Sequence, residues 1–322
     1  MVRVATIGGG PIVRTFVAAL GEVPGIELAG AYSRDPERAA ALASEFGAAT
    51  GWSSMDDLLA DDAVDAVYVA SPNSVHYGQA LAVVEAGKHV LLEKPAVTSA
   101  AEFTTLLEAA AQRGVIVFEG MRNAYDPGTA KVRELLGELG PIRRVSFVYC
   151  QRSARYDQVL AGEQVNIFDP ELAGGALFDL GVYCVSALVD LFGPPDRVLG
   201  LTVPIRSGVD GAGVALAAYP GFVADLSYSK ITVSGRPSEI QGEAATMTID
   251  HITAPRRLEV RTPAGEIRQY VIDPPTAGLP VDNLRFELLR FLDLVAGRAT
   301  PEPDQARTLE TIRVIDALRA AD

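Results

Sequence analysis

The chain has 322 residues, and its 41 acidic residues against 28 Lys and Arg give a formal net charge of −13. A content of 48% hydrophobic and 21% charged residues is that of an ordinary globular protein, and the chain is long enough for two domains. Because nucleic acids and anionic membrane surfaces are bound by concentrated positive charge, the acidic balance argues against both as partners.

The few cysteines and histidines exclude further classes of protein. Cys150 and Cys184 lie far apart in the sequence, which is typical of a reducing compartment and gives no disulfide framework. No histidine stands at metal-ligand spacing, so no structural metal site is expected. The N-terminus shows a strand pattern where a leader would be, and no apolar run approaches the ~20 residues of a membrane helix. We therefore expect a cytoplasmic protein.

Strand-like and helix-like segments alternate over the first third of the chain. The predicted strands are Val2–Ile7, Ile26–Ala31, Ala66–Ala70, His89–Leu92 and Val115–Phe118. The predicted helices are Pro11–Leu20, Pro36–Phe46, His76–Ala86 and Ala100–Arg113. Short apolar strands alternating with helices predict a doubly wound parallel sheet, which we assign to a first domain of residues 1–122.

The pattern changes after about residue 143. One helix, Ala176–Phe192, precedes a series of strands separated by turn signals: Val198–Ile205, Gly213–Tyr219, Val223–Val233, Thr246–His251, Arg257–Arg261 and Ile267–Ile272. Two amphipathic helices, Asn283–Ala296 and Asp304–Ala320, follow. Successive strands joined by short turns predict a mostly antiparallel sheet in a second α/β domain, residues 123–322.

A glycine turn joins the first strand to the first helix. Gly8 and Gly10 match the first two glycines of a G-x-G-x-x-G motif, while Val13 stands at the third. Pro11 and Ile12 open the helix, whose N–H groups can bind a pyrophosphate. A simple turn is the alternative, but the position after the first strand of a βαβ unit favours a dinucleotide site.

The end of the second strand indicates which dinucleotide is bound. An acidic residue there would favour NAD, whereas an arginine accommodates the 2′-phosphate of NADP. This strand is followed by Ser33 and Arg34, which favours NADP, with NAD possible. Alternatively, Arg34 pairs with Asp35 or Glu37.

Two later strands end in residues that can reach the same cleft, because ligands of such sheets bind beyond the carboxyl ends of the strands. The fourth strand leads into Ser71, Pro72, Asn73 and His76, where helix capping by Asn73 or Ser74 is the alternative. The next strand leads into Glu93-Lys94-Pro95, where Lys94 is a candidate for proton transfer.

The long helix of the second domain carries the other candidate catalytic residues. Asp179 and Tyr183 are four positions apart and share a helix face, where both can reach a substrate hydroxyl; alternatively, Asp179 belongs to the first turn and Tyr183 to the core. Gly181 between them is unfavourable inside a helix and suggests the close approach of another group.

Four segments resemble the glucose-fructose oxidoreductase, inositol dehydrogenase and rhizopine catabolism family, written Gfo/Idh/MocA. They are Ile7–Ile12, Ser71–His76, Ala86–Pro95 and Gly174–Tyr183, and the resemblance covers nearly the whole chain. It implies an N-terminal Rossmann domain, a C-terminal open sheet through which homodimers or homotetramers form, and NAD(P)-dependent oxidation or reduction of sugars, polyols or related alcohols.

The resemblance also implies roles for single residues. Lys94 would be the central catalytic lysine, and Asp179 would orient the substrate. Many members carry His where this chain has Tyr183. A tyrosine at this position makes the chain resemble the branch that contains dihydrodiol dehydrogenase and NADP-linked xylose dehydrogenase. We expect Lys94 and Tyr183 to share the proton transfer. The residues predicted to bind the cofactor are Gly8, Gly10, Pro11, Ile12, Ser33, Arg34, Ser71, Pro72, Asn73, His76, Glu93, Lys94 and Arg122.

One segment departs from the family pattern, and the role of another has two alternatives. Many relatives place Trp and Arg-Phe after the last strand of the first domain, where this chain has Glu119 and Arg122 as candidate cofactor contacts. Arg152, Arg155 and Tyr156 precede the catalytic helix and belong either to the substrate pocket or to a solvated loop.

The leading hypothesis is an NADP-preferring oxidoreductase for a carbohydrate-like substrate. A second is a dinucleotide-binding sensor without catalysis, against which Lys94, Asp179 and Tyr183 count. A third is an enzyme that retains its cofactor and transforms a sugar without net redox change.

Overall fold

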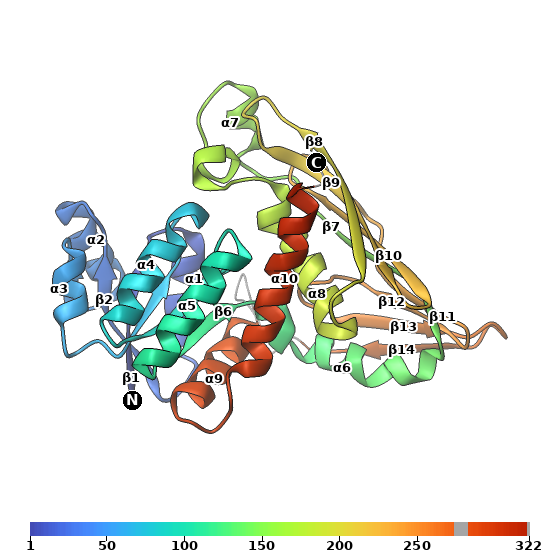
Figure 1. The fold of residues 1–322 in the computed structure, drawn as a ribbon, viewed down its shortest axis with the longest axis horizontal. Helices are drawn as coiled ribbons and strands as arrows, with labels where there is room; N and C mark the ends of the chain where they lie inside the picture. Colours follow the sequence, from blue (N-terminus) through green and yellow to red (C-terminus); the bar gives the residue numbers. More distant parts are fainter. Residues whose placement is uncertain (274–282, 321–322) are drawn as a thin grey trace. The chain divides into compact units, whose positions relative to one another are not determined.

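The computed structural model describes residues 1–273 and 283–320, which divide into two compact units, each with a sheet of its own (Figure 1). Of the described residues, unit 1 contains 1–120 and 283–309, and unit 2 contains 121–273 and 310–320. The first division lies two residues from the expected boundary at 122. The assignment of residues 283–309 differs from the expected domains, since this segment belongs to unit 1.

Unit 1 is built on a six-stranded sheet of order β3-β2-β1-β4-β5-β6, in which all pairs are parallel. Its strands are β1 Val2–Ile7, β2 Ile26–Tyr32, β3 Thr50–Trp52, β4 Ala66–Val69, β5 His89–Glu93 and β6 Val117–Gly120. Its helices are α1 Pro11–Leu20, α2 Pro36–Phe46, α3 Met55–Ala60, α4 Asn73–Glu85, α5 Ala100–Arg113 and α9 Leu284–Val295. The predicted doubly wound domain is confirmed, and β3 and α3 are additions to it.

Helix α9 belongs to unit 1 because its apolar face completes that core. Leu288 and Phe291 are fully buried, and the ring of Phe291 lies 5.9 Å from that of Phe118 at β6. The helix also packs against α1. Helix α10, Glu302–Ala320, follows it, and the division between the units falls within α10 after residue 309.

Unit 2 is built on an eight-stranded sheet of order β14-β13-β12-β11-β7-β10-β9-β8. Its strands are β7 Ile142–Cys150, β8 Arg197–Pro204, β9 Asp210–Tyr219, β10 Phe222–Ser229, β11 Ser238–Gly242, β12 Thr246–Ile249, β13 Arg257–Arg261 and β14 Ile267–Val271. Its α-helices are α6 Pro127–Leu135, α7 Tyr156–Leu160 and α8 Val182–Phe192. A π-helix, Leu177–Gly181, precedes α8, and 3₁₀ turns cover Arg122–Tyr125, Leu136–Leu139, Asn166–Phe168 and Pro170–Leu172.

The predicted mostly antiparallel sheet is confirmed, with one exception at its centre. Strand β7 runs parallel to β10 and antiparallel to β11, and neither β7 nor β11 was among the predicted strands. Strand β10 ends at Ser229, four residues before the predicted end, so Lys230 begins the connection to β11.

The helical stretch Pro170–Phe192 covers one face of this core. Its 23 residues are long and apolar enough to span a membrane by composition, in contrast to the expectation that no run approaches this length. Within the described residues 78% of its apolar window is buried, which is the pattern of a core helix. The cytoplasmic location stays a prediction.

Candidate active site

The turn between β1 and α1 is shaped for a bound anion. Gly8 has φ +119°, and a Cβ there would lie 2.5 Å from the carbonyl oxygen of Ala70, so only glycine fits. Gly10 caps α1 without a side-chain hydrogen bond, and Pro11 and Ile12 form the first turn, which has no acidic residue. Together with the position of β1 beside β4, where the strand order reverses, this geometry fits a dinucleotide pyrophosphate.

Val13, at the third glycine position, is fully buried beneath this turn. Its Cγ2 would lie 3.4 Å from a Cβ on Gly8. The side chain therefore fills the space between strand and helix that a third glycine leaves for backbone contact.

Two arginines lie in the segment after β2, Arg34 in the connection and Arg38 in the first turn of α2. The Oγ of Ser33 accepts a hydrogen bond from the N–H of Asp35, which caps α2. Arg34 is exposed, and the described residues show no ion pair between it and Asp35 or any other carboxylate. Arg38 was not among the predicted cofactor-binding residues; its Nη2 lies 3.3 Å from where a Cβ on Gly9 would stand, so a second guanidinium borders the glycine turn.

His76 connects the loop after β4 with the loop after β5. The side chain is buried, with Nδ1 3.0 Å from the carbonyl oxygen of Pro95 and Nε2 2.8 Å from that of Ser71. Burial lowers the pKa of His76, and the positive charge of Lys94 acts in the same direction. Direct contact of His76 with the cofactor stays a prediction; the structure shows it holding two loops together.

The other residues of the loop after β4 are placed as follows. Helix α4 begins at Asn73, three residues before its predicted start, and is capped by Pro72 without a side-chain hydrogen bond. The hydroxyl of Ser71 donates to Oε1 of Gln79 over 2.6 Å. The N-cap position is thus Pro72, and Asn73 and Ser74 are the first two residues of the helix.

Lys94 lies directly after β5, half-buried, and is joined to Pro95 by a cis peptide bond. The hydroxyl of Tyr68 donates to Oε1 of Glu93 over 2.5 Å. On the other side of the turn, the N–H of Ala96 donates to Oε1 of Glu119 over 2.9 Å. Together with His76, these contacts hold the backbone around Lys94 at the carboxyl edge of the sheet.

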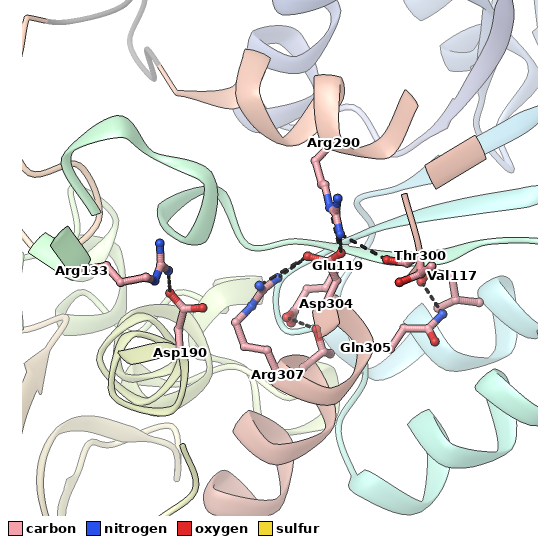
Figure 2. A network of polar contacts seen from close by, with 10 residues as sticks. Val117, Glu119, Arg133, Asp190, Arg290, Thr300, Asp304, Gln305 and Arg307 are labelled. Carbon is pink, nitrogen blue, oxygen red and sulfur yellow. Dashed lines mark hydrogen bonds and ion pairs between the residues drawn. The ribbon is translucent and has the colours of Figure 1, made fainter. Parts of the chain in front are cut away.

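Glu119 is the centre of a buried polar network in unit 1 (Figure 2). Its Oε2 accepts a hydrogen bond from the hydroxyl of Thr308 on α10, 2.9 Å away, and burial raises its pKa. Nearby, Arg290 donates to Oδ2 of Asp304 at 2.7 Å, and Gln305 donates to the carbonyl oxygen of Val117 at 3.2 Å. The network therefore joins α9 and the start of α10 to β6. Glu119, expected to contact the cofactor, supports the Lys94 turn.

In unit 2, tight glycine contacts shape the entry to the helix that carries Asp179. Gly175 has φ +125°, and a Cβ there would clash with the carboxylate of Asp210. Oδ2 of Asp210 accepts a hydrogen bond from the N–H of Leu177 over 2.7 Å, at the first residue of the π-helix. A Cβ on Gly181 would lie 3.0 Å from the ring of Tyr228, which is the close approach that the sequence predicted.

Asp179 lies on the π-helix, where it is paired with a lysine that the sequence analysis overlooked. Nζ of Lys230 donates to Oδ2 of Asp179, and the lysine is almost completely buried. The signal was available in the sequence, because Lys230 is the only charged residue besides Asp225 in the predicted strand Val223–Val233.

Tyr183 lies one turn further, on α8, in a cluster of polar and aromatic side chains. Its Oη accepts a hydrogen bond from Nε of Arg122 over 3.3 Å, and the guanidinium lies 5.2 Å from its ring centroid. Arg122 also donates to Oγ1 of Thr253, and the edge of Tyr149 contacts Tyr183. Arg122 was predicted on the cofactor side; in the structure its guanidinium supports Tyr183, and contact with the cofactor stays a prediction.

The segment before the catalytic helix has the character of a solvated loop. Arg152 pairs with Asp157 over 2.6 Å and stacks on Tyr156, while Arg155 is exposed. Because the guanidinium of Arg152 already has a carboxylate partner, these contacts favour the loop over an anion-binding pocket.

Comparison with known proteins identifies the family. The model described as an oxidoreductase family with an NAD-binding Rossmann fold matches residues 2–121, and the GFO/IDH/MocA C-terminal domain matches residues 129–248. The chain is 36% identical over 321 residues to scyllo-inositol 2-dehydrogenase (NADP(+)) of Bacillus subtilis, covering 99% of this chain and 96% of that protein. The chain belongs to the Gfo/Idh/MocA family. It is an NAD(P)-dependent dehydrogenase or reductase.

The chain is also similar to two further proteins. D-xylose 1-dehydrogenase (NADP(+)) 2 of Haloferax volcanii is 32% identical, covering 91% of this chain and 88% of that protein. The expected similarity to NADP-linked xylose dehydrogenase is thus confirmed. The structure of KijD10, a 3-ketoreductase of Actinomadura kijaniata in complex with NADP and TDP-benzene, matches with a TM-score of 0.88 at 24% identity, covering 99% of this chain and 97% of that one. This last likeness shows the fold.

Proposed function

We propose that this enzyme is an NADP-preferring dehydrogenase or reductase that acts on a CH–OH group of a polyol or sugar, with Lys94 as its central proton-transfer residue. The main observation behind the proposal is the set of hydrogen bonds that fix the backbone next to Lys94. His76 and Glu119 bind the two residues that follow Lys94, at the sheet edge that also carries the glycine turn.

The preference for NADP rests on the charge at the end of β2. Ser33 and Arg34 stand where an acidic residue would hold a 2′-hydroxyl, and Arg38 adds a second guanidinium beside the glycine turn. The guanidinium groups of Arg34, directly after the strand, and of Arg38, on α2, suit a 2′-phosphate. The relatives from Bacillus subtilis and Haloferax volcanii, whose names include NADP(+), support this choice.

The chemistry that a bound nicotinamide would supply is hydride exchange with the substrate carbon. Side chains of the protein must then accept the proton of the substrate hydroxyl as the carbonyl forms. In the reverse direction they return this proton. We assign this proton to Lys94 assisted by Tyr183, because an amine and a phenol can both give and take a proton. Asp179, whose oxygens accept hydrogen bonds when ionised, orients a second hydroxyl of the substrate.

A substrate panel tests this function. The probes are scyllo-inositol, D-xylose, other sugars and polyols, and a trans-dihydrodiol, each with NADP+ and with NAD+, followed by absorbance at the nicotinamide band. We expect oxidation of at least one probe with higher kcat/KM for NADP+. Tight cofactor binding with no turnover of any probe would favour a sensor, and copurified cofactor that never exchanges during turnover would favour the redox-neutral reaction.

We also assign self-association to the sheet of unit 2. One face of β8, β9 and β10 exposes a row of apolar side chains: Leu199, Leu201, Val203, Val214, Leu216 and Val223. In the sheet register Leu199 lies opposite Leu216 and Leu201 opposite Val214, so the row forms a continuous patch. Exposed apolar patches of this kind mark association surfaces, and a second copy of the chain, in a homodimer or homotetramer, would cover it.

A further inference from the structure

We infer that Lys230 is a positioning residue that holds the carboxylate of Asp179 in place to accept a hydrogen bond from a substrate hydroxyl. The inference rests on the role given to Asp179 in the proposed function. It adds a residue that lies on another element and carries the opposite charge.

The burial of Lys230 requires an explanation. Its side chain is only 4% exposed, although lysine is almost never buried to this degree unless it is paired. Nζ donates to Oδ2 of Asp179 and lies 5.4 Å from the ring centroid of Phe168. The carboxylate and the aromatic face together make the buried ammonium tolerable.

The backbone of Lys230 is fixed on both sides. Its N–H donates to the carbonyl oxygen of Gly211 over 2.8 Å, and its carbonyl oxygen accepts from the N–H of Ser153 over 2.8 Å. Because the lysine follows directly on β10, in the interior of the sheet, the ammonium is presented from a rigid element.

Asp179 stands on a less regular element. It lies on the π-helix, and its side chain is 36% exposed, in contrast to its partner. The ion pair therefore has a buried ammonium and a partly exposed carboxylate. With Oδ2 held by Lys230, the accessible part of the carboxylate can accept a hydrogen bond, and an ionised carboxylate can only accept.

This arrangement specifies the chemistry of the group that Asp179 recognises. A hydroxyl donates a hydrogen bond to the carboxylate, whereas a carboxylate or phosphate at the same place would be repelled by it. The substrate must therefore present a hydrogen-bond donor and no anion to Asp179, and the hydroxyls of polyols and sugars meet this requirement.

The test compares Lys230→Met, Lys230→Arg, Asp179→Asn and the double variant Lys230→Met with Asp179→Asn. Kinetics use the fastest probe of the panel with NADP+, and crystal structures of wild type and Lys230→Met show the Asp179 carboxylate. Met has a similar length without charge, which suits a buried position. For Lys230→Met we expect kcat/KM to fall about 10- to 100-fold with a raised KM, as a misplaced orienting group predicts, while NADPH binding is unchanged. A loss of folded enzyme would lower kcat and leave KM unaltered.

The double variant decides whether Lys230 acts through Asp179. If it does, the double variant is no worse than Asp179→Asn alone, and the effects are not additive. Lys230→Arg restores part of the activity, and the Asp179 carboxylate moves in the crystal structure of Lys230→Met. Additive effects, wild-type kinetics of Lys230→Met beside an impaired Asp179→Asn, or an unmoved carboxylate would overturn the inference. Wild-type kinetics of Asp179→Asn would instead overturn the role of Asp179 in the proposed function.

Discussion

Arg34 is the residue on which discrimination between the two dinucleotides depends most. Its guanidinium is exposed and has no carboxylate partner among the described residues, so it can meet a 2′-phosphate. A charge-assisted hydrogen bond contributes about 1.5–3 kcal/mol. We expect Arg34→Ala to weaken NADPH binding about 10- to 100-fold in fluorescence titrations and to leave NADH binding unchanged.

The matched control is Arg113→Ala, at the last turn of α5, which leads to the amino end of β6 and so to the opposite edge of the sheet. Equal weakening of NADPH and NADH by Arg34→Ala, or an equal effect of Arg113→Ala, would remove Arg34 from the recognition of the phosphate.

Glu119 makes stability depend on pH. Burial raises the pKa of its carboxyl above the value in the unfolded chain, so with rising pH the unfolded chain releases this proton first. The stabilising contribution is full below the ordinary glutamate range and is lost as pH rises through the folded-state pKa. Glu119→Gln keeps an acceptor for the N–H of Ala96 and has no charge to bury.

We therefore expect the free energy of unfolding, measured with urea, to fall less between pH 5 and pH 8 in Glu119→Gln than in wild type. The variant becomes more stable relative to wild type as pH rises. Glu108→Gln, an exposed change on α5, should follow wild type at both pH values. A difference between Glu119→Gln and wild type that does not vary with pH would contradict the role of burial.

Residue types at strand ends were sufficient to single out Lys94, because the carboxyl edge of a parallel sheet is where such sheets bind ligands. Lys230 was conspicuous as a charged residue in a predicted strand, but its pairing with Asp179, 51 positions away, is visible only in the structure. His76 and Glu119 were found as polar residues near the cleft, but only the three-dimensional contacts show that they bind the backbone next to Lys94.

Among the elements, the entry to the π-helix combines two constraints at Gly175. A side chain there would be strained at φ +125° and would displace the carboxylate of Asp210 from the N–H of Leu177. For Gly175→Ala we expect a destabilisation of about 2–4 kcal/mol. This is the sum of backbone strain of about 1–3 kcal/mol and the loss of a helix cap of about 1 kcal/mol. Thermal unfolding measures it.

Gly235→Ala in the same unit is the control, since a Cβ there would meet no atom within 4 Å. If both alanine variants unfold together with wild type, the contact between Gly175 and Asp210 does not stabilise the unit.

The predictability of elements follows their dependence on local pattern. Strands β1 and β5 and helices α1, α2 and α5 are close to prediction because apolar spacing and caps such as Asp35 and Ser99 are local signals. Strand β7 was overlooked because Arg143 and Arg144 interrupt its apolar pattern, although it lies in the interior of the sheet. The π-helix has no signal of its own beyond the unexpected Gly181.

At the scale of the whole molecule, the apolar row on β8, β9 and β10 predicts association. Leu201 is 66% exposed and Leu216 54%. Burial of each leucine contributes about 1.5–3 kcal/mol to an interface, so Leu201→Asp should shift the enzyme toward monomer in sedimentation velocity. Leu160→Asp, at a leucine of similar exposure on α7, should not. A wild-type monomer, or a dimer unaffected by Leu201→Asp, would contradict this assignment.

The assignment of residues to the two units was predictable only in part. The change from alternating strands and helices to consecutive strands located the first boundary, because it reflects the type of sheet. The return of α9 to unit 1 depends on the packing of Phe291 against Phe118, which helix periodicity alone cannot reveal.

Proton transfer by Lys94 is tested most directly by the turnover and NADPH binding of Lys94→Met. General acid–base catalysis contributes about 100- to 10,000-fold, so kcat with the best probe of the panel should fall at least about 100-fold. NADPH affinity should remain close to wild type, because the glycine turn and Arg34 are unaltered. A fully active Lys94→Met enzyme, with its NADPH binding intact, would contradict the central role of this lysine.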